Sequence, residues 1–166
     1  MTISMYQASA PVFDKMLANL SGILGKAATW AETRKIEPAV LLNARLAPDM
    51  FALTRQVQIA CDFAKGTCAR LAGVEPPKFE DNESSIADLQ ARIAKTRQYV
   101  GTFKAPQIDG SEGRDIKFKA GPRELEFKGL PYLTAFALPN FYFHHAMTYA
   151  ILRHNGLDLS KPDYIG

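Results

Sequence analysis

The sequence has few of the residues that would place it in a specialised class of protein. It contains two cysteines in 166 residues, too few for a disulfide-stabilised scaffold. Cys61 and Cys68, if they share a helix, lie about 10.5 Å apart along its axis, beyond the roughly 7 Å that a disulfide spans. Two unpaired thiols are typical of a reducing compartment, so we expect a cytoplasmic protein.

Long apolar runs and strong charge are also missing. No apolar run approaches the roughly 18 residues of a membrane-spanning helix, so no membrane segment is expected. The N-terminus, MTISMYQASAPVFDKM, lacks the basic and apolar parts of a signal peptide. Lys plus Arg is 20 against 17 for Asp plus Glu, and a net charge of +3 is too weak for a nucleic-acid partner.

The common catalytic motifs are absent as well. The chain has no G-x-S-x-G, G-x-G-x-x-G, P-loop or C-x-x-C sequence, so the motifs indicate no nucleophile, nucleotide site or redox pair. The acidic run Glu80–Glu83 lacks the spacing of a calcium loop and is interpreted as a solvated loop. Composition thus describes a single globular domain over residues 1–166 and leaves its activity open.

Apolar residues recur every three or four positions in most of the chain, which predicts amphipathic helices. We expect helices over about 6–31, with Pro11 near the start, over 48–72 after Pro48, and over 85–100 after Ser85. The segments RDIKFK and RELEFK alternate polar and apolar residues around Ala-Gly-Pro, which predicts a β-hairpin with Ile116 and Phe118 on one face.

A final helix is expected from Leu130 or Pro131 to His154, where Asn155-Gly156 ends it. The tail after Gly156 is too short to predict an element of its own. Each helix has one apolar face to bury, so we predict a mainly all-α fold, a four-helix bundle with a short β-hairpin before the last helix.

Asn140 and His144 interrupt the apolar face of this final helix. They are four residues apart and therefore point the same way. A buried Asn and His need hydrogen-bond partners, which leaves two explanations: a structural polar network, which we favour, or a ligand or metal site. The adjacent His145 lies about 100° around the helix and is expected at the edge of the bundle.

Asp49 and Gln56 are seven residues apart on the expected second helix and flank its apolar face. Asp49 follows Pro48 in the expected first turn, where the helix dipole stabilises a carboxylate. The alternative is that Asp49 turns inward and reaches His144 as a hydrogen-bond acceptor or a metal ligand.

The last helix, NFYFHHAMTYAILRHNG, resembles the final helix of the DinB/YfiT-like bundle superfamily. Members commonly carry H-x-x-x-H there, which aligns Asn140 with the first histidine and His144 with the second. The segments RLAPDMFALTRQVQIACDFAKGTCARLAG and KPDYIG are similar to an uncharacterised subgroup of that superfamily, a domain of unknown function. The resemblance implies an up-down-down-up bundle, frequent dimers and, in many relatives, a divalent metal held by three histidines.

The chain departs from that three-histidine pattern. His144 remains, Asn140 replaces a ligand, and the second helix offers Asp49 or Gln56 in place of a histidine. We therefore expect a homodimeric bundle without the usual metal site, holding a polar network or a small ligand. The alternative is a divergent metal-dependent enzyme, a thiol transferase or hydrolase, in which zinc or nickel is held by His144, Asn140 and Asp49. The aromatic residues of the last helix indicate a dimer face.

Overall fold

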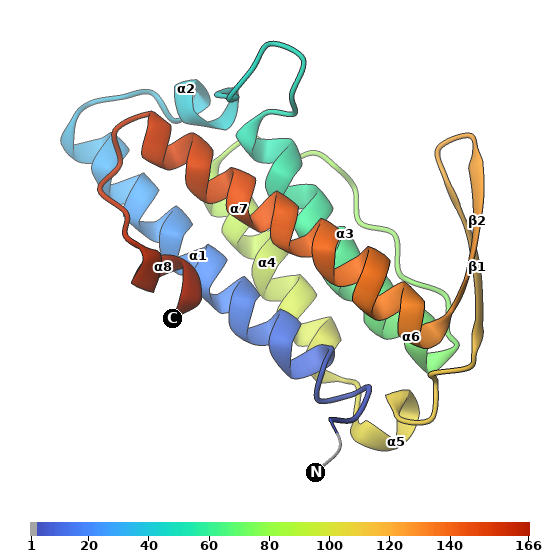
Figure 1. Ribbon diagram of the computed structural model, residues 1–166. Coiled ribbons are helices and arrows are strands. Elements are labelled where there is room, and N and C mark those ends of the chain that lie inside the picture. Colours follow the sequence, from blue (N-terminus) through green and yellow to red (C-terminus); the bar gives the residue numbers. More distant parts are fainter. Residues whose placement is uncertain (1–2) are drawn as a thin grey trace.

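Four long helices lie side by side in the computed structural model, which describes residues 3–166 (Figure 1). They are α1 (Ala10–Thr33), α3 (Leu53–Ala72), α4 (Ile86–Gly101) and α7 (Leu138–His154). The middle pair, α3 and α4, runs antiparallel to α1 and α7 (Figure 1). The predicted up-down-down-up bundle is therefore confirmed, with α3 packed between α7 and α4, and α1 packed against α4.

Short elements connect and close these helices. They are α2 (Pro38–Leu42), α5 (Ala105–Ile108), β1 (Asp115–Ala120), β2 (Arg123–Lys128), α6 (Gly129–Pro131), the π-helical turn η1 (Tyr132–Ala137) and α8 (Lys161–Ile165). Because α3 and α4 are parallel, the segment that connects them in the chain, residues 74–85, must run back along the length of the bundle (Figure 1). We call this segment the strap.

The hairpin forms as the alternating pattern predicts. Ile116 pairs with Phe127 and Phe118 with Leu125, so these four side chains share one face. The rings on this face pack against η1, with Phe118 and Tyr132 5.8 Å apart and Phe127 and Phe136 5.0 Å apart. The other face is solvated and carries ion pairs across the strands, including Lys117 with Glu126 at 2.9 Å.

The predicted start of the second long helix is wrong. The structure begins α3 at Leu53 rather than Pro48, and α2 is a separate helix of five residues. Pro48 lies in a turn that is closed by the Met50 amide donating to the Ala47 carbonyl at 3.0 Å. Because that turn redirects the chain, Asp49 is outside the helix that was expected to contain it.

The C-terminal tail does form an element, contrary to expectation. Ser160 and Asp163 cap α8, with the Ser160 amide donating to the Asp163 carboxylate at 2.8 Å. The short helix then packs against α1, where Asn19 donates to the Tyr164 carbonyl at 3.1 Å. Tertiary contacts of this kind stabilise a helix too short to persist alone.

Both cysteines are free and buried on α3. Burial raises the pKa of each thiol to about 12, so neither is a reactive thiolate at neutral pH. Among the described residues, no helix has the length and apolar character required to cross a membrane.

Candidate functional site

The π-helical turn η1 determines which residues of α7 face the bundle. A π-turn contains one residue more than an α-helical turn, which rotates the following residues by about 100°. The fully or nearly fully buried residues of α7 are Phe141, His144, His145, Thr148, Ile151 and Leu152. Asn140, expected on the inner face, is half-buried instead.

His144 is joined to α3 by a chain of hydrogen bonds. Its Nδ1 lies 2.7 Å from the Oε1 of Gln56, and the Nε2 of Gln56 donates to the Phe51 carbonyl at 3.1 Å. Gln56 is 1% exposed and His144 8% exposed. His144 and Gln56, both named as candidate site residues, are thus in direct contact between α7 and α3.

This chain of bonds fixes the tautomer of His144. The Phe51 carbonyl can only accept, so the amide nitrogen of Gln56 faces it and the amide oxygen faces His144. Nδ1 of His144 must then carry the hydrogen and donate it to Gln56. In the neutral ring, Nε2 therefore keeps a lone pair, and it is not among the fully buried polar atoms without a partner.

The surroundings of His144 favour its neutral form. Burial, together with the positive charge of Arg55, lowers the pKa of His144 from 6.5 to about 4. Phe63 stacks on the imidazole with ring centres 6.1 Å apart, and Phe143 meets it edge-on at 5.2 Å. At neutral pH the site therefore offers one hydrogen-bond acceptor, Nε2, between aromatic rings.

Asn140 and Asp49 do not join this contact. The Asn140 amide donates to the Phe136 carbonyl of its own helix at 2.7 Å. Asp49 is exposed in the loop before α3, because α3 begins later than predicted. Of the four predicted site residues, the structure brings together His144 and Gln56.

The side chains at the seam between α7 and α3, where His144 meets Gln56, do not fit the metal that the superfamily resemblance implies. Within residues 3–166, no three His, Cys, Asp or Glu side chains are placed together to hold a metal ion. His144 contributes one nitrogen there, and its nearest polar partner is an amide, a weak ligand for the metals that prefer imidazole. Neither His144 nor Asn140 lines any of five surface pockets, of 320 to 710 Å³, on the part of the chain that the structure describes.

His145 is buried in the bundle, and its predicted position at the edge is wrong. Its Nε2 lies 3.0 Å from the Met16 carbonyl of α1, and Tyr164 of α8 packs edge-on at 4.5 Å. Nδ1 is buried and has no hydrogen-bond partner within the described chain. Burial lowers the pKa of His145 from 6.5 to about 4, partly offset by the Met16 carbonyl.

The strap contributes acidic side chains to a charged cluster that no sequence motif indicates. Arg92 of α4, with a side chain 2% exposed, contacts Asp62 at 2.9 Å, Asp81 at 3.0 Å and Glu83 at 2.8 Å. The acidic run interpreted as a solvated loop therefore holds the strap to the bundle. Although burial opposes ionisation, hydrogen bonds from Arg92 and Gln58 lower the pKa of Glu83.

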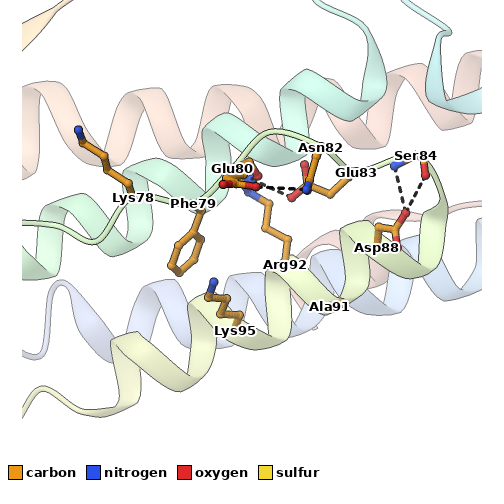
Figure 2. Close-up of a pocket in the computed structure, with 10 residues that line it drawn as sticks. All are labelled: Lys78, Phe79, Glu80, Asn82, Glu83, Ser84, Asp88, Ala91, Arg92 and Lys95. Atoms are coloured by element: carbon orange, nitrogen blue, oxygen red, sulfur yellow. Dashed lines mark hydrogen bonds and ion pairs between the residues drawn. The ribbon is translucent and has the colours of Figure 1, made fainter.

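Figure 2 shows the pocket beside this cluster, where the strap passes over α4. It has a volume of about 710 Å³, and Phe79 faces the ammonium of Lys95, whose nitrogen is 4.2 Å from the ring centre. Charges of both signs line the pocket, and Asp88 accepts from the Ser84 amide at 3.0 Å. The mixture of paired charges gives the pocket no clear preference for one class of ligand.

Comparison with known proteins places the whole chain in one family. Residues 5–165 match the family described as "Domain of unknown function (DUF1993)". The fold is similar to the crystal structure of a DinB family member from Shewanella denitrificans, with a TM-score of 0.87 and 41% sequence identity. The alignment covers 97% of this chain and 91% of that one. No curated protein matches the sequence.

Proposed function

The chain belongs to the DUF1993 family of DinB-like proteins, and from this premise we propose that it binds a small hydrogen-bond donor at His144 without a metal. The observation that carries the proposal is the bond from Nδ1 of His144 to Gln56 at 2.7 Å. That bond leaves Nε2 as an acceptor. The stacked ring of Phe63 and the edge-on ring of Phe143 supply apolar contact beside it.

The chemistry of this acceptor defines a suitable ligand. A neutral imidazole binds a group that carries an O–H or N–H, and an aromatic body would pack against the neighbouring rings. Phenol combines both features, and anisole has the same ring without the donor. A comparison of the affinities of phenol and anisole therefore separates recognition by Nε2 from nonspecific apolar contact.

The test is a titration followed by two-dimensional NMR of the full chain. We expect phenol to shift the resonances of His144 and Phe143, and anisole to bind more weakly by roughly fivefold or more, since one hydrogen bond contributes about 1 kcal/mol. His144→Phe should abolish the difference between the two compounds. His154→Gln, which removes an exposed histidine at the end of α7, should preserve it. Equal binding of phenol and anisole would refute the proposal.

The alternative function is a divergent metal-dependent enzyme, and the lone pair on Nε2 of His144 is the observation that favours it. Metal analysis after purification from metal-replete cells separates the two. Our proposal expects less than one equivalent of zinc or nickel and no change on His144→Ala. A full equivalent that disappears in this variant would favour the enzyme instead.

We also propose that the protein is a cytoplasmic homodimer that associates through the surface next to His144. Phe51 is 56% exposed and Phe143 50% exposed; Phe143 meets the His144 ring edge-on, and the Phe51 carbonyl accepts from Gln56, the partner of His144. Sedimentation measurements should show a dimer at high micromolar concentration, and Phe143→Ser should shift it toward monomer. A monomer throughout that range would contradict the dimer. The two free, buried thiols are the feature that supports the cytoplasmic location.

A further inference from the structure

A second pocket lies beside α1, and neither His144 nor any residue of the strap lines it. It has a volume of about 620 Å³ and is formed by the C-terminal half of α1 and the segment after α7. Trp30 supplies the aromatic wall, and Leu157 and Asp158 supply the opposite side. This volume is within the usual range for small-molecule sites.

Backbone geometry keeps the two sides of this pocket close together. Gly156 has a φ of +96°, which side chains rarely tolerate, and a Cβ there would lie 3.7 Å from the Trp30 ring. The Arg153 guanidinium donates to the Leu157 carbonyl at 3.0 Å, which fixes the start of the segment. The wall after α7 is therefore held at both ends, because Arg153 bonds its start to α7 and Asn19 of α1 bonds to the Tyr164 carbonyl of α8, which follows it.

The charged side chains around Trp30 differ in whether they have an ion-pair partner. Lys26 is neutralised by Asp163 at 2.5 Å. Arg34 lies over the Trp30 ring at 5.1 Å and forms no ion pair with any residue in the described range 3–166. Asp158 is fully exposed, and its carboxylate lies 3.9 Å from Arg153. Arg34 is therefore the uncompensated charge at this pocket.

We propose that the Trp30 pocket binds an aromatic carboxylate, with the flat ring against Trp30 and the carboxylate on Arg34. The planar guanidinium matches a carboxylate through two parallel hydrogen bonds, and the indole provides a large apolar surface. Thr29 and Thr33 each donate their hydroxyl hydrogen to a carbonyl one turn earlier, so neither hydrogen is available to a bound carboxylate and the contact falls to Arg34. The proposal does not depend on the function proposed for His144.

The single tryptophan of the chain makes the proposal directly measurable. Trp30 gives one indole N–H signal in a ¹H–¹⁵N spectrum of the full chain, and 2-naphthoate is the probe. We expect a saturable shift of this signal. 2-Naphthamide, which has the same ring and no charge, should bind at least about tenfold more weakly, because a charge-assisted bidentate contact is lost.

Two charge variants decide whether Arg34 is responsible. Arg34→Gln should remove the preference for 2-naphthoate over 2-naphthamide. Arg123→Gln, which removes the same charge from the exposed end of the hairpin, should retain it. Thermal unfolding of both variants checks that they are folded. The proposal is overturned if 2-naphthoate gives no saturable shift, if both compounds bind equally, or if Arg34→Gln keeps the preference.

Discussion

His144 and His145 are neighbours in the sequence but lie in two different environments. His144 points to α3, donates from Nδ1 to Gln56 and retains an accessible Nε2. His145 points to α1, donates from Nε2 to the Met16 carbonyl and has its Nδ1 sealed inside the protein. The two rings thus hold their hydrogen on opposite nitrogens.

The difference indicates separate roles for the two side chains. A buried ring that contacts α1 and α8 contributes to packing, and its 0% exposure leaves no atom for a ligand. A ring at the seam between two helices, with a free acceptor, is available for binding. The adjacent histidines therefore do not form one site: His145 is a structural residue, and His144 is a candidate functional one.

The largest expected effect is on stability. His145→Ala removes a fully buried ring and a hydrogen bond and should lower the free energy of unfolding by about 3 kcal/mol. His144→Ala should cost less, roughly 2 kcal/mol, because the ring is 8% exposed and its removal admits water to Gln56. Urea unfolding measures both values. A larger loss for His144→Ala would contradict the assignment of roles.

The second expected effect is a dependence of stability on pH. The pKa of His145 is about 4 in the folded chain, against 6.5 when unfolded. Between these values the unfolded chain binds a proton and the folded chain does not, so stability falls as the pH falls below 6.5. From pH 7 to pH 5 the loss from His145 should be about 2 kcal/mol.

Urea unfolding at these two pH values tests this dependence in the wild type and in His145→Gln, in which the side-chain amide replaces the donor to the Met16 carbonyl. The variant should lose about 2 kcal/mol less than the wild type on acidification, because His144, whose folded pKa is also about 4, contributes a similar loss in both proteins. An equal loss in both proteins would show that His145 does not carry the effect.

A carboxylate at position 56 should make the pKa values of the two histidines differ. Gln56→Glu places a negative charge beside Nδ1 of His144, which should raise the pKa of His144 by about 2 units and leave His145 unchanged. The pH titration of the two imidazole signals by NMR measures both values. Gln56→Leu is the matched control, because it removes the hydrogen bond without adding charge.

The smallest effect is spectroscopic and needs no substitution. At pH 7 the ring ¹⁵N and ¹³C shifts should identify the Nδ1–H tautomer for His144 and the Nε2–H tautomer for His145. The same tautomer in both rings would contradict one of the two hydrogen-bond assignments.

Much of the fold could be predicted from the hydrophobic pattern. The periods of 3.6 and 2 locate α1, α4 and the hairpin, since each buries one continuous face. The start of α3 was mispredicted because Pro48 is suited both to the first turn of a helix and to the tight turn in which it lies. Local sequence does not distinguish these two uses.

Two of the four residues that the sequence singled out as candidates, His144 and Gln56, lie in contact in the structure. Asp49 was misplaced with the start of α3, and Asn140 bonds to its own helix. The acidic strap and Arg92 lie far apart in the sequence, so no motif connects them before the chain folds.

The sequence alone determined the helical bundle, the hairpin and the scarcity of metal ligands, because these follow from residue types and their spacing along the chain. The tertiary structure decided which histidine meets which helix. The extra residue in η1 rotates α7, and the position of α3 against α7 then selects Gln56 as the partner of His144. Hydrogen bonds between distant segments depend on that rotation, and the spacing of apolar residues along the sequence does not predict it.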